Sequence, residues 1–178
     1  SADNGAYGEF DSIDDILDCK NPFDPFALHK AALIACGFIP LDSKYTLDDI
    51  LTCAGGGIKL STQVLGIPRG SGLGTSSILA GACQKALHNF FGLDSSDENL
   101  FNAVLIMEQL MSTGGGWQDQ VGGLVKGFKL ISTLPGLSQN IKCDKLTLTN
   151  ETQKELDKRF AIIYTGQRRL ARNLLRDV

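Results

Sequence analysis

Apolar residues recur at helical spacing in several stretches of the chain, and turn-forming residues mark where those stretches begin and end. Asp24-Pro25 opens one such stretch and Gly37 closes it, as at the two ends of a capped helix. Thr46-Leu-Asp-Asp is typical of a capping box, and Gly92 is a natural stop for the stretch before it. We therefore expect helices over 25–36, 46–54, 78–90, 97–111, 151–158 and 170–178.

Other apolar runs alternate or are short, which favours strands. Residues 58–65 alternate between apolar and polar side chains, as in a half-buried strand, and Phe-Ala-Ile-Ile-Tyr at 160–164 reads as a compact buried strand. The run at 124–131 predicts a hairpin interrupted at Gly127, and residues 141–149 alternate imperfectly. This mixture of helices and strands indicates an α/β or α+β domain.

A glycine-rich loop joins the strand expected at 58–65 to the helix that follows it. Gly70, Gly72 and Gly74 allow the backbone to turn sharply and to approach a ligand. Thr75, Ser76 and Ser77 fall at the start of the helix, where free N–H groups and the helix dipole favour an anion such as a polyphosphate. The loop lacks the Gly-Lys-Ser/Thr end of a Walker A motif and meets G-x-G-x-x-G only in part. The alternative interpretation is a flexible turn without a ligand.

Glu108 shares the apolar face of its helix with Val104 and Phe101, where a carboxylate without a partner is costly. One possible partner is Mg²⁺, which takes few protein carboxylates and completes its shell with water, phosphates and a hydroxyl such as that of Ser76. The other is a lysine or arginine at the edge of the helix. The residue pattern alone leaves both open.

Asp119 follows Gly114-Gly-Gly-Trp-Gln, and we expect it in a glycine-flanked loop where the backbone can crowd a substrate and the carboxylate can accept a proton. Gln118 and Gln120 beside it offer both hydrogen-bond donors and acceptors, which suit a sugar. Trp117 suits stacking on a pyranose ring, although a lone tryptophan is also a common core anchor.

Composition limits the choice of class. The chain has 178 residues, 43% of them hydrophobic, and a formal net charge of −3, which does not favour a nucleic-acid surface. Its five cysteines form no C-x-x-C pair, so a reducing cytoplasm fits better than a disulfide framework or a zinc site. No apolar run approaches the length of a membrane span and no signal peptide is recognisable, and the chain reads as a fragment.

The loop also carries a family resemblance. The pattern P-x-x-x-G-L-G-[ST]-S, present here as Pro-Arg-Gly-Ser-Gly-Leu-Gly-Thr-Ser at 68–76, is similar to the ATP-binding motif of the GHMP kinases. Its longer form through Ala82, together with Gly-Gly-Trp-Gln-Asp-Gln-Val-Gly-Gly at 115–123, resembles the L-fucokinase branch, including fusions to a GDP-fucose pyrophosphorylase. Fucokinases also carry a segment similar to residues 164–175, whose arginines are either ligand contacts or a solvated face.

The resemblance implies a site and a fold. It assigns ATP to Pro68, Arg69, Gly70, Ser71, Gly72, Leu73, Gly74, Thr75, Ser76 and Ser77, magnesium to Ser76 and Glu108, catalysis to Asp119, and the sugar to Trp117, Gln118, Gln120 and Arg168. It implies the ribosomal-protein-S5-like N-terminal domain over residues 24–178, truncated at both ends and without its C-terminal lobe. Residues 1–23 are expected to be an acidic leader of the same domain.

The activity implied is ATP-dependent phosphorylation of the anomeric hydroxyl of L-fucose, in the salvage route to GDP-fucose. Other sugars, such as a heptose phosphate or galactose, are an alternative, as is a nucleotide-binding fragment without activity of its own. The early substrate-binding strand and the late glycine-rich motif of the family are not recognisable in this sequence. We expect ATP, Mg²⁺ and a small sugar as partners, neither nucleic acid nor membrane, and self-association through uncovered apolar surface.

Overall fold

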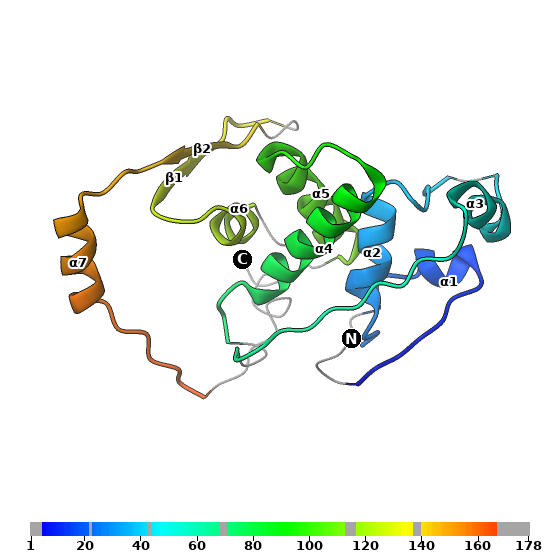
Figure 1. The fold of residues 1–178 in the computed structure, drawn as a ribbon, viewed down its shortest axis with the longest axis horizontal. Helices are drawn as coiled ribbons and strands as arrows, with labels where there is room; N and C mark the ends of the chain where they lie inside the picture. The colour runs from blue at the N-terminus through cyan, green and yellow to red at the C-terminus, as the bar shows by residue number, and fades with distance from the viewer. Residues whose placement is uncertain are drawn as a thin grey trace.

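The computed structural model describes residues 5–21, 23–42, 44–67, 71–112, 117–136 and 140–166. Helices dominate these residues, and a single small sheet joins them, so the mixed α/β or α+β class is confirmed (Figure 1). Within the described ranges, no helix is both long and apolar enough to cross a bilayer. The elements are α1 Ile13–Leu17, α2 Ala27–Ala35, α3 Leu47–Ala54, α4 Thr75–Phe91, α5 Asp97–Leu110, α6 Gln118–Leu124, β1 Lys129–Ser132, β2 Lys142–Lys145 and α7 Asn150–Arg159.

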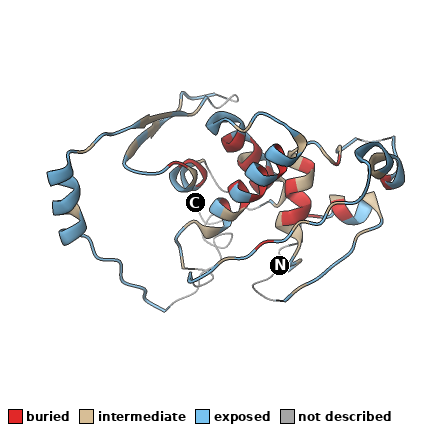
Figure 2. Ribbon diagram, in the orientation of Figure 1, coloured by how far each residue is buried: buried red, intermediate tan, exposed pale blue. Residues whose placement is uncertain are grey.

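The centre of the fold is a bundle in which α4 packs against both α2 and α5 (Figure 1). Buried residues colour the facing sides of these three helices in Figure 2. Gln84 is fully buried at the junction, where its Nε2 donates to the Ala32 carbonyl at 3.1 Å and contacts Met107 Sδ at 3.1 Å. The apolar core around it consists of Ile16, Cys19, Ala31, Ala32, Ile34, Ile39, Leu47, Ala80, Cys83, Leu87, Val104 and Met107.

The predicted helix boundaries are largely confirmed, because local signals set them. Thr46 and Asp49 exchange both bonds of a capping box, with Thr46 N–H donating to Asp49 Oδ2 at 2.8 Å. Gly92 ends α4 in the left-handed conformation at φ 68°. The helix expected from residue 25 starts two residues later, since Asp24 Oδ1 accepts the Phe26 N–H at 2.8 Å ahead of the first turn.

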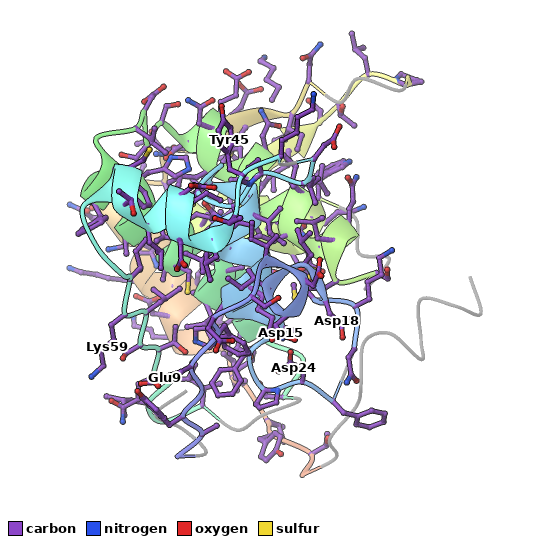
Figure 3. The ribbon with its side chains drawn as sticks, turned by 90° about the vertical axis from the view of Figure 1, so that its right-hand side faces the viewer. Glu9, Asp15, Asp18, Asp24, Tyr45 and Lys59 are labelled. Carbon is purple, nitrogen blue, oxygen red and sulfur yellow. The ribbon has the colours of Figure 1, made fainter. Side chains whose placement is uncertain are left out.

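The N-terminal segment packs on the same core. Ile16 and Cys19 are buried against the bundle, and Lys30 Nζ pairs with Asp24 Oδ2 at 2.7 Å while lying over the Phe10 ring at 4.6 Å from its centroid. Figure 3 shows Glu9, Asp15, Asp18 and Asp24 on the part of the surface formed by this segment and α1. Glu9, Asp15 and Asp18 therefore face solvent at the edge of a packed segment, whereas Asp24 is largely covered in its pair with Lys30.

The hairpin and the segment before it differ from the sequence-based expectation. Residues Gln118–Leu124 form the short helix α6, whereas we expected a loop followed by strand. The sheet begins only after Gly127, where β1 pairs antiparallel with β2 in the register Leu130–Asp144. Val121 and Val125, one helical turn apart, are both buried and form a small second core with Phe101, which explains why this stretch is helical.

Residues 58–65 show the expected alternation but no ladder. Ile58, Leu60 and Val64 are half-buried, Thr62 is buried, and the residues between them are exposed, yet these residues join no sheet in the part of the chain that the structure describes. The segment lies against α2 instead, where Thr62 Oγ1 and His29 Nε2 are 2.9 Å apart. The burial pattern was correctly predicted and the sheet pairing was not.

The prediction of a buried strand at 160–164 is wrong. Phe160, Ile162 and Ile163 are 74%, 80% and 84% exposed, and no sheet forms here in the described ranges. The helix α7 before it carries no buried residue either (Figure 2). An apolar run is buried only where another element covers it, and nothing described here covers this one. The helix expected at 170–178 lies outside the described residues.

Candidate functional site

The start of α4 is open to a ligand. Gly72 and Gly74 adopt φ values of 76° and 63°, the left-handed region that glycine reaches without strain, and Gly74 is the N-cap. No side chain caps the helix, and its first internal bond runs from the Ile78 N–H to the Gly74 carbonyl at 3.1 Å. The N–H groups of residues 75–77 therefore precede the first turn of bonds, at the positive end of a 17-residue helix, where an anion is favoured.

The loop before this helix supplies a further polar group. The hydroxyl of Ser71 is buried and has no hydrogen-bond partner among the described residues, whereas Leu73 at the tip is 49% exposed. Thr75 is half-buried and Ser76 is exposed on the first turn. Pro68, Arg69 and Gly70 lie outside the described residues, so the structure describes residues 71–77 of the predicted phosphate loop.

Glu108 lies at this same end of the bundle. Residues 92–96 connect α4 to α5 as a short turn, so the last turn of α5 comes beside the first turn of α4. There the Ser77 hydroxyl donates to Glu108 Oε1 at 3.0 Å, with Ser77 3% and Glu108 8% exposed. The hydroxyl in contact with Glu108 is thus that of Ser77, one residue after the Ser76 expected from the motif.

These donors suit a hard divalent cation. A carboxylate and serine hydroxyls beside a phosphate-binding helix end are the oxygen ligands that Mg²⁺ takes together with water and phosphate oxygens. Among the described residues no group of three or more His, Cys, Asp or Glu side chains is placed to hold a metal by itself. A cation bound at Glu108 would therefore need further ligands, such as hydroxyls, water or phosphate oxygens.

The residues expected to bind the sugar lie on or just before α6. Asp119 and Gln118 are exposed in its first turn, and Trp117, at the N-cap, is half-buried. Gln120 is 2% exposed, and its Oε1 has no partner among the described residues. Asp119 is thus held by a helix, where we expected a flexible loop. Arg168 lies outside the described residues.

The helix α6 packs directly on α4 and also touches α5; its C-terminal turn makes the contact with α4, where Gly123 lies against Ile78 and Leu124 against Gly81. The sequence contained a signal for α6, since Val121, Leu124 and Val125 have the i, i+3, i+4 spacing of a helical face. The glycine pair inside this segment concealed it, because glycines usually indicate a loop.

Each of the two histidines makes a hydrogen bond that joins two parts of the fold. His88 Nδ1 lies 2.7 Å from the Asp94 carbonyl, where it fastens the turn between α4 and α5. His29 joins α2 to residues 58–65 through Thr62, and burial lowers its pKa. Neither lies among the residues expected to bind nucleotide or sugar.

Comparisons with known proteins agree with this arrangement. Residues 43–127 match the family described as the GHMP kinases N terminal domain. The chain is 42% identical over 169 residues to a bifunctional fucokinase/GDP-fucose pyrophosphorylase of Arabidopsis thaliana, covering 93% of this chain and 15% of that protein. It is 38% identical over 181 residues to an L-fucokinase/L-fucose-1-P guanylyltransferase of Bacteroides fragilis, covering all of this chain and 19% of that protein.

The chain thus spans less than a fifth of the length of these two relatives. No solved structure matches it. The matched family segment includes the glycine loop, Glu108 and α6 in one continuous stretch. Residues 43–127 of this chain therefore match the GHMP kinase N-terminal domain, and the similarity to the two fucokinase relatives extends over 93% to 100% of the chain.

Proposed function

We propose that this chain is part of an ATP-dependent sugar kinase that phosphorylates the anomeric hydroxyl of L-fucose. The observation that carries the proposal is the Ser77–Glu108 bond of 3.0 Å, which holds a buried carboxylate at the uncapped start of α4. The names of the two relatives supply the sugar. By the same likeness, we propose a place in cytoplasmic salvage of fucose to GDP-fucose.

The phosphates of ATP would bind at residues 68–77. The N–H groups of the first turn of α4 point out of the helix start, and Gly72 and Gly74 remove the side chains that would obstruct a close approach. Ser71 adds a hydroxyl without a partner among the described residues. Arg69 fits the same role by its charge.

Magnesium would be held by Glu108, with a hydroxyl from Ser76 or Ser77 and with phosphate oxygens. When bound, the ion neutralises charge that develops on the transferred phosphoryl group. Glu108 itself is kept in one orientation by Ser77, which spares the carboxylate the cost of reorganising when the nucleotide arrives.

Asp119 would accept the proton from the anomeric hydroxyl as that oxygen attacks the γ-phosphorus, while the bond from the γ-phosphorus to the β,γ-bridging oxygen breaks and ADP leaves. Its exposure at the start of α6 leaves the carboxylate accessible to a substrate. Gln118, Gln120 and Arg168 would hydrogen-bond the sugar, and Trp117 would cover one of its faces. Because phosphoryl transfer depends chiefly on positioning and charge, these contacts decide both rate and sugar choice.

The proposal is tested by ATP-dependent phosphorylation of L-fucose, galactose and a heptose phosphate with the complete protein. We expect fucose to be preferred, and Asp119→Asn to lower kcat by about 10²- to 10⁴-fold, the usual contribution of a general base. Asp97→Asn is the matched control, because Asp97 is also an exposed acid in the first turn of a helix. If another sugar is preferred, that sugar would take the place of L-fucose as the proposed substrate. If ATP binds but no sugar is phosphorylated, the protein would be a nucleotide-binding module without kinase activity.

A further inference from the structure

The helices α4 and α6 meet at two glycines, one on each helix. A Cβ atom built on Gly123 would lie 2.6 Å from Ile78 Cγ1, and one built on Gly81 would lie 1.9 Å from Leu124 Cδ2. Both distances are shorter than any normal carbon–carbon contact, so a side chain at either position would force the helices or their neighbours to shift. These two glycines permit the observed close packing.

Neither glycine is explained by its backbone conformation. Gly81 and Gly123 are inside helices and are absent from the residues with positive φ, unlike Gly72 and Gly74. In a helix interior glycine is the least favourable residue apart from proline. Packing therefore explains both glycines, and backbone geometry does not.

The contact lies between the two halves of the proposed site. Ile78 directly follows Ser77, whose hydroxyl holds Glu108 at the phosphate-binding end of α4. Asp119 precedes Gly123 by four residues, so the two share one face of α6 and are separated by about one turn, roughly 6 Å along the axis. The Gly123–Ile78 contact therefore couples the position of α6, which carries Asp119, to the first turns of α4.

We propose that Gly81 and Gly123 are positioning residues that set the distance from Asp119 to the phosphate-binding turn of α4. The inference rests on the proposed kinase function. A methyl group at Gly123 would displace α6, since Ile78 is β-branched and keeps essentially one rotamer in a helix. A methyl group at Gly81 would displace Leu124, which packs on both apolar clusters and so cannot move without disturbing either. In phosphoryl transfer a displacement of this size separates the base from the reacting hydroxyl.

Gly122 and Gly123 provide a matched pair of variants. Both are in α6, but a Cβ on Gly122 meets nothing within 4 Å. In the complete protein we expect Gly123→Ala to lower kcat by about tenfold or more, because a misplacement of about 1 Å can cost 10²-fold. The Kd for a non-hydrolysable ATP analogue should stay within about twofold, since α4 keeps its start. Gly122→Ala should leave both quantities close to those of the wild type.

A compensating change separates positioning from simple loss of stability. Ile78 is 41% exposed, and Ile78→Ala removes the atom that the new methyl group would strike. We expect the double variant Gly123→Ala with Ile78→Ala to regain most of the lost kcat. Equal kcat for Gly123→Ala and Gly122→Ala overturns the proposal. The proposal is also overturned if the double variant folds but its kcat stays as low as that of Gly123→Ala. It is overturned as well if Gly123→Ala lowers the melting temperature but leaves kcat per folded molecule unchanged. A wild-type protein that turns over no sugar would instead refute the proposed function, and this inference with it.

Discussion

The bundle of α2, α4 and α5 and the extended segments 58–65 and 160–164 all carry apolar patterns that predict burial, but they differ in how far their apolar residues are buried in the structure. In the bundle, Val104 and Met107 are fully buried. In the second extended segment, Ile162 and Ile163 are 80% and 84% exposed. Segment 58–65 is intermediate, with alternate residues covered by α2. The difference teaches that an apolar pattern tells which residues can be buried, and that a covering partner decides whether they are.

The physical reason is the range of the hydrogen bonds. A helix makes its backbone hydrogen bonds between residues four apart, so the same stretch of sequence both shows the apolar pattern and forms the structure. A strand makes its backbone hydrogen bonds with another strand, and the apolar pattern of one strand does not identify its partner. Each helix predicted within the described residues is present, whereas neither 58–65 nor 160–164 joins a ladder there.

The largest effect is expected from opening the bundle. Met107→Ala removes a side chain with 0% exposure at the junction with Gln84, and we expect it to lower the free energy of unfolding by about 2–5 kcal/mol. Urea denaturation measures this. Ile106→Ala on the same helix is the control, because Ile106 is 43% exposed and its truncation should cost much less. Equal losses would mean that the bundle is not the stabilising core.

A smaller effect is expected where segment 58–65 attaches to α2. Thr62→Val keeps the shape of the side chain but removes the hydroxyl that bonds buried His29, at a cost of about 1–3 kcal/mol for a buried polar group left without its partner. Thermal unfolding measures the loss. Ser61→Ala, at the exposed neighbouring position, should be close to neutral. If Thr62→Val and Ser61→Ala lose the same amount of stability, the Thr62 hydroxyl does not hold segment 58–65 on α2.

The same contact predicts a dependence on pH. Burial lowers the pKa of His29, so between that lowered value and its unfolded value of about 6.5 the unfolded chain binds more protons than the folded one. Stability should therefore fall as the pH drops below about 6.5. Denaturant midpoints at pH 7 and pH 5 test this, and His29→Gln should flatten the slope in that interval. An unchanged slope in His29→Gln would assign the pH dependence to other groups.

The smallest effect is expected in the segment at 160–164. Ile163→Ser changes a side chain that is 84% exposed, so the free energy of unfolding should change by no more than about 0.5 kcal/mol. Urea denaturation of the same protein preparation is the measurement. A loss of about 2 kcal/mol or more would show that Ile163 is covered in solution, and would remove the contrast with Met107.

Some parts of the candidate site could be predicted from the sequence and others could not. The loop at 68–77 was singled out from its glycine content and position, Glu108 from the expected helix face, and Asp119 from the resemblance to the GHMP kinases. The pairing of Glu108 with Ser77 was not, since neighbouring hydroxyls differ only in the direction that the helix gives them. The helix α6 was missed because Gly122 and Gly123 read as a loop, although packing against α4 is what Gly123 allows.

The sequence by itself determined several helix ends and the glycine-rich turn ahead of α4. The Thr46 capping box and the left-handed Gly92 act within a few residues, so no distant partner is needed to read them. Only the tertiary structure decided which hydroxyl meets Glu108, where α6 rests, and which apolar segments are covered. Those outcomes depend on contacts between residues that are far apart in the chain, such as Ser77 with Glu108 and Ile78 with Gly123, and local spacing does not encode them.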